Sequence, residues 1–334
     1  MKGMMMGTIK RYHIVLLLML TVVLAACRPA RNRGPTPIPT NTPAPISTPL
    51  PLVPTAIPPG VAENPLKVAL VAFDAEAAAE QVEALQQLIL DEAGVAVEIL
   101  LVERYAEALA ALCSSVGQDV TAAWLDGIAY LAAEAQGCGD PVLAIVRDVD
   151  GEPSIGDTGQ VIVSATFGSN RLSVLPTRTF CRLGVTDFYS WLLPLLIFEA
   201  NDINSDSFAG VVDYEDTESL ISAVIDGDCA GTGIASATLN QLIADDESIR
   251  DGVRVAATSA PFPYGILTMP IEVPLGTRIA LINGLEAIAE DEEKSAILYP
   301  FLGQDDLDTV NVEAFAELRD FMAETGVDLA QLGN

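Results

Sequence analysis

The 334-residue chain is poor in histidine, in basic residues and in aromatic residues. Its single histidine, His13, lies in an N-terminal stretch that has the composition of an export signal. Catalysis by Ser-His-Asp or Cys-His groups and zinc binding through histidine are therefore excluded from the remainder of the chain. The cysteines form no CxxC pair, so their spacing matches no zinc motif. We expect no catalytic residues, no metal and no cofactor.

Positive charge is also scarce, with 17 Lys and Arg against 46 Asp and Glu. All 46 acidic residues lie at Glu63 or later, together with 11 of the basic ones, so this part has a formal net charge of −35. A field of this sign repels nucleic acid and anionic lipid surfaces. We expect no nucleic acid partner, and no membrane contact other than a lipid anchor.

The N-terminal residues are typical of an exported lipoprotein. Residues 1–27 combine a positive start with a short apolar run and end in Leu-Ala-Ala-Cys, which resembles a lipobox with Cys27 as the lipidated residue. The alternative is a plain secretory signal that contains a cysteine. Residues 28–64 are rich in Thr-Pro and Ile-Pro steps, which favour an extended polyproline II tether. We expect an extracytoplasmic protein anchored to the cell membrane by its N-terminal lipid.

Four further cysteines, an even number in an exported chain, predict two disulfides. Three pairings are possible. We favour Cys113–Cys138 and Cys181–Cys229, because each pair then stays within one predicted lobe.

Apolar strand patterns alternate with helical periodicity after residue 65, which predicts an α/β fold with mostly parallel sheets flanked by helices. Helices are expected at 75–93, 105–113 and 217–225, and short strands at 95–102, 160–167 and 172–175. The stretch 180–201 is expected to begin as a loop and continue as an apolar helix. Thr186 or Asp187 is expected to cap this helix.

Three local motifs resemble one known family. Residues 119–130, DVTAAWLDGIAY, are similar to a D-x-A-W-L-G-P-x-x-Y turn, and residues 187–194, DFYSWLLP, stand where the family has S-T-S-G-Y-L-x-P. Residues 226–231 and 259–263, DGDCAG and SAPFP, resemble the two segments that follow. The family is that of the PhnD-like phosphate/phosphite/phosphonate-binding proteins of ABC transporters.

The resemblance implies a two-lobed type II periplasmic-binding-protein fold. Residues 65–167 and 261–334 would form lobe 1, and residues 168–260 would form lobe 2. The two lobes would close about a hinge near residues 167–170 and 257–263. The function implied is capture of a small molecule between the lobes and its delivery to an ABC permease, by a monomer.

The residues themselves predict a pocket with Trp124, Asp126 and Tyr130 from the first lobe and Thr186, Asp187, Tyr189 and Ser190 from the second. Core packing is the alternative for Trp124 and Tyr130, and helix capping is the alternative for the two aspartates. Aromatic rings beside carboxylates suit a cation or a polyol better than an oxyanion, so the ligand is expected to differ from phosphonate. Arg178 and Arg182 could reverse this preference if they reach the pocket.

Other functions fit the same sequence. A lipoprotein of this fold could present its ligand to a membrane receptor, or serve as a surface scaffold without transport. An enzyme using Asp213, Glu215 and Asp216 is a further alternative, although this acidic run has the pattern of a solvated turn.

Overall fold

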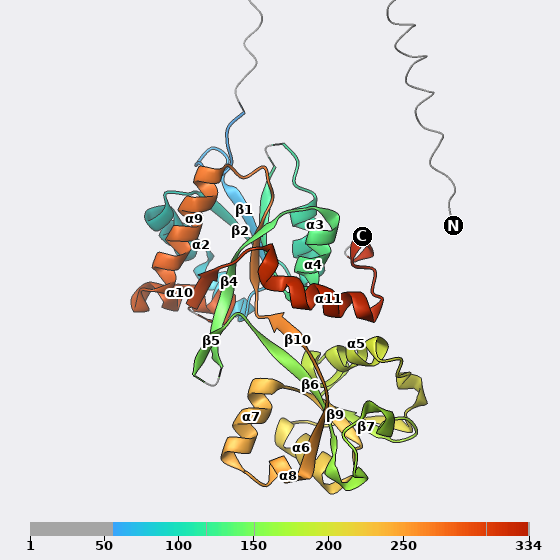
Figure 1. Ribbon diagram of the computed structural model, residues 1–334. Helices are drawn as coiled ribbons and strands as arrows, with labels where there is room; N and C mark the ends of the chain where they lie inside the picture. Colours follow the sequence, from blue (N-terminus) through green and yellow to red (C-terminus); the bar gives the residue numbers. More distant parts are fainter. Residues whose placement is uncertain (1–55, 118, 150, 305, 333–334) are drawn as a thin grey trace, which may run out of the picture. The chain divides into compact units, whose positions relative to one another are not determined.

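Short apolar runs of the sequence form the strands of two separate β-sheets (Figure 1). The computed structural model describes residues 56–117, 119–149, 151–304 and 306–332. The first sheet has the strand order β12-β4-β11-β3-β1-β2, and β5 pairs with β4. Its strands are β1 (Leu66–Leu70), β2 (Val97–Leu101), β3 (Thr121–Leu125), β4 (Asp140–Val149), β5 (Glu152–Ser154), β11 (Ile266–Met269) and β12 (Asp306–Thr309).

The second sheet has the order β10-β6-β9-β7-β8. Its strands are β6 (Gly156–Ser164), β7 (Thr179–Arg182), β8 (Gly210–Asp213), β9 (Gly231–Ala235) and β10 (Val253–Pro263). Each sheet with its helices forms one lobe. The expected lobe 1 runs to residue 167, whereas residues 156–164 pair in the second sheet, so the chain first crosses between the sheets at Ile155–Gly156.

Both sheets are mixed, which corrects the expectation of mostly parallel sheets. Parallel pairing joins β1 to β2 and β3, and β7 to β8 and β9. The strands that leave and re-enter a sheet pair antiparallel instead, as β6 does with β9 and β10, and β11 with β3 and β4. A chain that crosses to a second sheet and returns must run in opposite directions on its two crossings.

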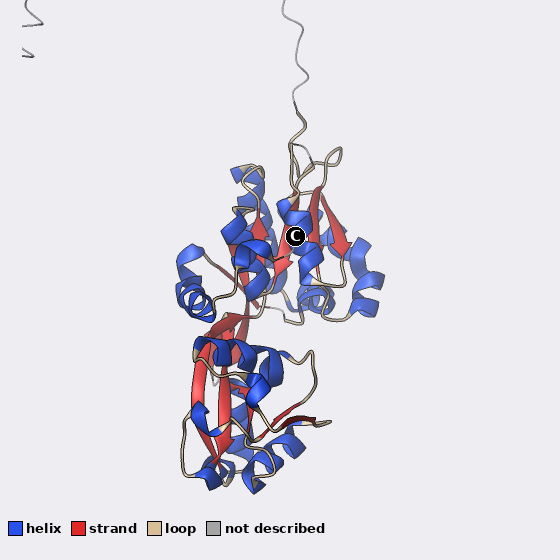
Figure 2. Cartoon of the chain, turned by 90° about the vertical axis from the view of Figure 1, so that its right-hand side faces the viewer, coloured by secondary structure: helices blue, strands red, loops and turns tan. Residues whose placement is uncertain are grey.

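Helices lie on both sides of the first sheet (Figure 2). The helices that follow or flank its strands are α2 (Ala75–Ala93), α3 (Tyr105–Cys113), α4 (Gly127–Gln136), α9 (Leu275–Ala289), α10 (Glu292–Leu302) and α11 (Ala316–Thr325). Those of the second lobe are α5 (Leu193–Ala200), α6 (Thr217–Asp226), α7 (Ser236–Asp245) and α8 (Ile249–Gly252). In the part of the chain described, no helix is long and apolar enough to cross a membrane.

The C-terminal helix contacts both lobes. We expected residues 261–334 to belong to lobe 1, and α11 does follow strand β12 of that sheet. However, α11 also packs against α5 and β10, and the rings of Phe321 and Phe262 lie 5.9 Å apart. One buried apolar cluster therefore continues from the first lobe through α11 into the second.

Two expected elements differ from the structure. Residues 172–174 form a short 3₁₀ helix, η2 (Leu172–Val174), instead of a strand. The missing strand is β7, in the segment that we expected to be a loop. Phe180 is buried there between Phe198 and Phe208, with ring centroids 5.4 and 5.6 Å away, and this packing gives four residues enough burial to form a strand.

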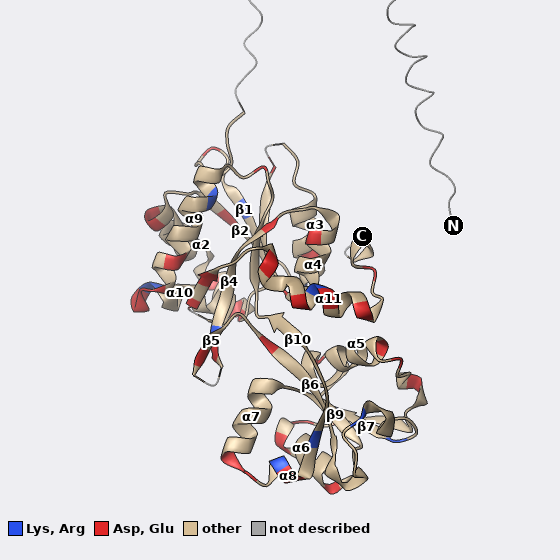
Figure 3. Ribbon diagram, in the orientation of Figure 1, with Lys and Arg blue, Asp and Glu red and all other residues tan. Residues whose placement is uncertain are grey.

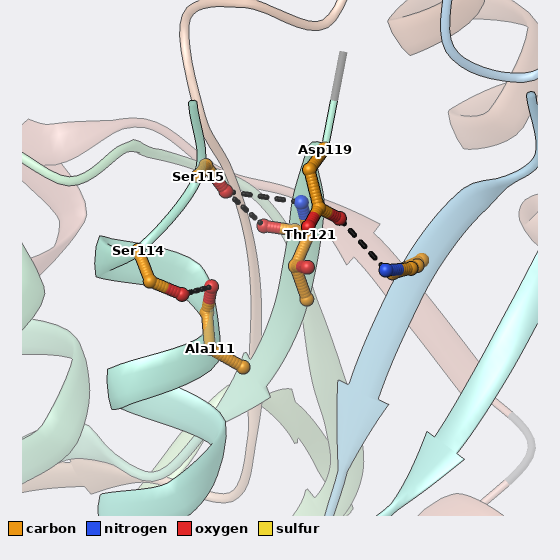
Figure 4. A network of polar contacts seen from close by, with 6 residues as sticks. Ala111, Ser114, Ser115, Asp119 and Thr121 are labelled. Carbon is orange, nitrogen blue, oxygen red and sulfur yellow. Dashed lines mark hydrogen bonds and ion pairs between the residues drawn. The ribbon is translucent and has the colours of Figure 1, made fainter. Parts of the chain in front are cut away.

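A polar network closes the connection between α3 and β3 at the amino end of the strand (Figure 4). The Ser115 hydroxyl accepts a hydrogen bond from the Thr121 amide at 3.0 Å, and the Ser114 hydroxyl donates to the Ala111 carbonyl at 3.0 Å. Lys67 of β1 pairs with Asp119 at 2.7 Å. These contacts fix the start of β3, whose other end leads into the candidate site.

The last residues of the expected tether belong to the folded part. The carbonyl of Gly60 accepts from the Ala96 amide at 2.9 Å, and the Asn64 side chain donates to the Ile57 carbonyl at 2.9 Å. Cys27 and the tether up to residue 55 lie outside the described residues.

Both expected disulfides are present, so the pairing that keeps each bridge within one lobe is confirmed. Cys113–Cys138 joins the end of α3 to the segment after α4, and Cys181–Cys229 joins β7 to the segment before β9. Because the second bridge closes a loop of 48 residues, it removes considerable entropy from the unfolded chain.

We predict that the Cys181→Ala/Cys229→Ala variant loses about 2–4 kcal/mol of unfolding free energy. Urea denaturation followed by circular dichroism measures this loss. Wild-type protein reduced with dithiothreitol before denaturation should lose at least as much. An unchanged urea midpoint in the variant would show that the bridge does not stabilise the fold.

Candidate functional site

Side chains from both lobes line a cavity of about 250 Å³. The first lobe contributes residues that follow the carboxyl ends of β2 and β3, and the second lobe contributes the short helix before α5. The lining residues are Tyr105, Asp126, Gly127, Ile128, Phe188, Tyr189, Phe262, Pro263 and Tyr264. This combination of aromatic walls with a few polar groups is typical of a small-molecule site.

A second cavity of about 120 Å³ adjoins the first, because Tyr105 and Tyr264 line both. It extends beneath the carboxyl end of β1, where Phe73 is exposed, and its polar lining includes Arg147 of β4. Trp124 forms part of its apolar wall. We treat the two cavities together as the candidate site, because Tyr105 and Tyr264 form a wall of both.

A larger surface groove of about 490 Å³ lies between α4, α11 and the C-terminal turn. Two of its ionisable side chains, Arg319 and Glu134, already form an ion pair with each other. No aromatic ring lines this groove, and its residues all come from one lobe. It therefore lacks the convergent polar groups that mark a ligand site.

The fold explains why Tyr105 and Asp126 meet. Strands β1, β2 and β3 are parallel, so their carboxyl ends lie at one edge of the sheet. Tyr105 is the first residue of α3, after β2, and Asp126 caps α4, directly after β3. In open α/β sheets this edge is where ligands bind.

The second lobe positions Phe188 and Tyr189 on η3 (Phe188–Leu192), a single π-helical turn. Such turns are frequent at functional sites. The turn lies directly on the sheet because β9 has a glycine beneath it: a Cβ on Gly233 would collide with the Tyr189 carbonyl and the Pro194 ring. Close packing against the sheet therefore fixes the direction in which the two aromatic rings point.

Burial dominates the electrostatics of the site. Loss of solvent raises the pKa of Tyr189, and the neighbouring Asp157 carboxylate raises it further. The pKa values of Tyr105 and Tyr264 are raised for the same reason, with Asp126 acting on the first and Asp157 on the second. All three phenols are therefore neutral hydrogen-bond donors at physiological pH.

Asp126 has two roles. Its carboxylate accepts a hydrogen bond from the Ala129 amide at 2.7 Å and thereby caps α4, while the residue also lines the cavity. Burial raises the pKa of this carboxyl, although hydrogen bonds from the Ala129 and Ile128 amides oppose the shift. The charged form is consequently costly in the folded protein.

Arg147 is a site residue that sequence reasoning missed. Its guanidinium carbon lies 4.1 Å from the centroid of the Tyr264 ring, and its buried Nε has no hydrogen-bond partner among the described residues. A signal was available, since Arg147 directly follows the apolar run 142–146 and so stands near the end of a buried strand. Arg178 and Arg182, which we had considered instead, are engaged with Phe167 and with Asp213.

The structure brings three of the seven expected ligand residues to the cavities, namely Trp124, Asp126 and Tyr189. Thr186 is exposed, and Asp187 caps η3 through the Ser190 amide at 2.7 Å; neither lines a cavity described here. The remaining two residues are buried away from the site.

Those two residues have structural contacts instead. The Tyr130 ring packs 4.6 Å from that of Phe315, and the Ser190 hydroxyl accepts from the Leu183 amide at 2.9 Å. Trp124 is 6% exposed and belongs mainly to the core of the first lobe.

The opposite pKa shifts of two capping aspartates give a test of the site's electrostatics. Because the pKa of Asp126 is raised in the folded protein, its protonated form favours folding. This contribution to the free energy of unfolding is fully present below the unfolded pKa of about 3.9 and is lost as pH rises through the folded pKa. Asp126→Asn keeps a capping side chain and removes the buried charge. We therefore expect Asp126→Asn to melt at a higher temperature than wild type at pH 7, and to converge with it near pH 4.

The control is Asp216→Asn at the start of α6. Asp216 caps through the Ser219 amide at 2.8 Å, and hydrogen bonds from that amide and the Ser219 hydroxyl lower its pKa. Its stabilisation is present at neutral pH and is lost as pH falls, so Asp216→Asn should melt below wild type at pH 7. Calorimetry on both variants checks the pair. A lower melting temperature for Asp126→Asn at pH 7 would contradict the first prediction.

Comparison with known proteins identifies the family. Residues 68–328 match the family described as "ABC transporter, phosphonate, periplasmic substrate-binding protein". A solved structure from Xanthomonas citri, bound to chloride ion, is 16% identical, with a TM-score of 0.53 over 78% of this chain and 97% of that one. This similarity concerns the fold alone. No curated protein matches the sequence.

Two further structures are similar at lower scores. One is a binding protein component of an ABC phosphonate transporter from Pseudomonas aeruginosa, 13% identical, with a TM-score of 0.49 over 80% of this chain and 87% of that one. The other is PhnD1 from Prochlorococcus marinus in complex with methylphosphonate, 12% identical, with a TM-score of 0.47 over 78% of this chain and 98% of that one. The family match covers most of the sequence, and the chain therefore belongs to the PhnD-like periplasmic substrate-binding proteins of phosphonate ABC transporters, with their two-lobed type II fold.

Proposed function

We propose that this protein is an extracytoplasmic, lipid-anchored, monomeric solute-binding protein that captures a small molecule between its lobes and delivers it to an ABC permease. The observation that carries the proposal is the aromatic cavity lined from both lobes, at the carboxyl ends of parallel strands. The family to which the chain belongs supports the transport role. Asp126 and Tyr189, with Trp124 at the edge, are the expected residues that we retain as ligand contacts.

The proposal involves binding without catalysis. No group of three or more metal-binding side chains occurs among the described residues. The run Asp213, Glu215 and Asp216 lies at the end of β8 and the start of α6, and none of the three residues lines the candidate site. Asp213 and Asp216 have structural partners, the first in Arg182 and the second in Ser219.

We further propose that ligand binding moves the lobes about the two chain crossings. Strands β6 and β10 pair along much of their length, and the Tyr264 amide donates to the Ile155 carbonyl at 3.0 Å where both chains cross. Such a double connection permits bending while it keeps the lobes aligned. Because α11 packs on both lobes, its contact with α5 must shift when they move.

Ligand binding can be tested directly. Protein purified without dialysis is examined by native mass spectrometry, and a metabolite panel is then screened by thermal unfolding. A ligand present at 100 times its Kd stabilises the fold by about 2.7 kcal/mol, which raises the melting temperature by a few degrees. Small-angle scattering with that ligand should show a smaller radius of gyration.

Two tyrosine variants locate the site. Tyr189→Ala should abolish the ligand-induced shift, whereas Tyr214→Ala should retain it, because Tyr214 packs beside Cys229 and not in the cavity. Absence of a bound mass and of any thermal shift across the panel would refute the proposed function.

The lipid anchor is tested separately, since Cys27 lies outside the described residues. In a bacterial host, wild-type protein should incorporate labelled palmitate and fractionate with membranes. Cys27→Ser should lose the label and leave the membrane fraction. Cys181→Ser is the control, because it loses a disulfide but keeps the proposed lipidation site. A labelled Cys27→Ser protein would show that the anchor lies elsewhere.

A further inference from the structure

Arg147 differs from the other basic residues of the folded part. Seven of the eleven basic residues after residue 62 form ion pairs with Asp or Glu. Arg254 donates to backbone carbonyls, and Arg171 and Arg178 are exposed. Arg147 is half-buried, forms no ion pair in the described part of the chain, and has a buried Nε without a partner. A buried charged donor of this kind favours an anion that can complete its hydrogen bonds.

Three phenols surround the same space. Tyr105 and Tyr264 line both cavities, and Tyr189 lines the larger one. The positive charge of Arg147 opposes the rise in pKa of each of these tyrosines, so it lies within electrostatic reach of all three. Neutral phenols donate hydrogen bonds, as does the guanidinium. Together they offer a set of donors suited to a planar oxyanion.

The helix starts do not offer comparable donors. Asp126 accepts from the Ala129 amide at the start of α4, and Asp187 accepts from the Ser190 amide at the start of η3. In each case a carboxylate of the protein already occupies the place that an anionic ligand would take at a helix N-terminus. An incoming oxyanion must therefore rely on side-chain donors.

The charge balance of the site restricts the ligand further. Asp126 lines the cavity, and the Asp157 carboxylate acts on Tyr189 and Tyr264. A phosphate-type group carries roughly −1.5 to −2 charges near neutral pH, which a single arginine does not neutralise beside two carboxylates. A carboxylate carries only one charge, so the two carboxylates repel it less, while it can still pair with the Arg147 guanidinium. The remaining walls, Phe188, Phe262 and Pro263, are apolar and suit a hydrophobic body.

We propose that the ligand is a monocarboxylate with an apolar or aromatic body, and that Arg147 holds its carboxylate, assisted by the hydroxyls of Tyr105, Tyr189 and Tyr264. This proposal rests on the proposed solute-binding function and assigns the chemical class of the solute. Arg147 becomes the residue that determines specificity for the anionic group.

The test compares matched probes by isothermal titration calorimetry and thermal unfolding. Phenylacetate, benzoate and cyclohexanecarboxylate are the anions, phenylacetamide is the neutral isostere, and methylphosphonate is the phosphonate probe. At least one carboxylate should bind, about 10- to 100-fold more tightly than the amide, because the amide lacks the charge-assisted hydrogen bonds. Methylphosphonate should bind more weakly than the best carboxylate.

Variants assign the effect to Arg147. Arg147→Gln should weaken carboxylate binding about 10- to 100-fold, and Arg147→Lys should weaken it less, because a point charge remains. Arg178→Gln is the control: Arg178 also stacks on an aromatic ring, 3.9 Å from the Phe167 centroid, but lies outside both cavities. It should bind as wild type does. Near-ultraviolet circular dichroism of each variant shows whether its packing is native.

The outcomes separate this inference from the proposed function. Unchanged carboxylate affinity in Arg147→Gln would overturn the inference that Arg147 holds a carboxylate. Equal binding of phenylacetate and phenylacetamide to the wild type would overturn it as well. Tight binding of methylphosphonate, a sugar or a quaternary amine without carboxylate binding would overturn it while leaving solute binding intact. If no solute of any class bound, the proposed function itself would fail.

Discussion

The structure depends on one constraint, which is that the chain passes between its two sheets twice and that both passages lie side by side. The Ile155 carbonyl and the Tyr264 amide join them at 3.0 Å, and Pro263 pairs with Gly156. A side chain at Gly156 would collide with the Phe262 carbonyl, so only glycine allows this approach. The crossing also delivers Phe262, Pro263 and Tyr264 to the cavity. The connection that aligns the lobes therefore forms one wall of the candidate site.

Periodicity predicted the local structure well wherever one element is long or regularly amphipathic. Helices 75–93 and 105–113 have the expected bounds. Asp74 caps the first helix and Gly94 ends it, whereas the second has no side-chain cap and follows from its apolar periodicity. Strands β5, β7 and β12 were missed, because these short segments, EPS, TFCR and DLDT, contain no long run of apolar residues. The expected hinge near residues 167–170 also lies beyond the crossing at Ile155–Gly156. The sequence pattern does not reveal with which sheet a strand such as β6 pairs.

The candidate site was predictable only in part, because the sequence does not reveal which strands are neighbours in a sheet. Motifs located Asp126 and Tyr189, which lie at the starts of helices that follow strands. The motif tyrosine, Tyr130, lies one turn into α4, where its amide bonds to the Asp126 carbonyl and its ring points into the core. Tyr105 and Tyr264 follow two other strands, and Arg147 lies within β4. Their meeting depends on which strand ends are neighbours, and that is a property of the sheet order.

The distribution of charge over the surface differs from that in the candidate site. Acidic residues are spread over both lobes (Figure 3), which is consistent with the net charge of the folded part and distinguishes no single region. Within the site, one arginine is set among phenols and two carboxylates. The total charge of the protein therefore does not predict the charge of its ligand. In a buried site the dielectric constant is low, so the few charged groups nearby determine the electrostatic interaction with the ligand.

Two of the departures from the family motifs introduce an aspartate at a helix start. Asp126 stands in the place of a glycine before α4, and Asp187 stands in the place of a serine before η3. Each carboxylate accepts a hydrogen bond from an amide at a helix start, and the two helix starts lie in different lobes. At both helix starts a carboxylate of the protein takes the place of an anion, while Arg147 on β4 keeps a donor that is unpaired within the described residues. The family fold is thus retained, while carboxylates of the protein cap these two helix starts and the unpaired guanidinium Nε belongs to a strand, β4.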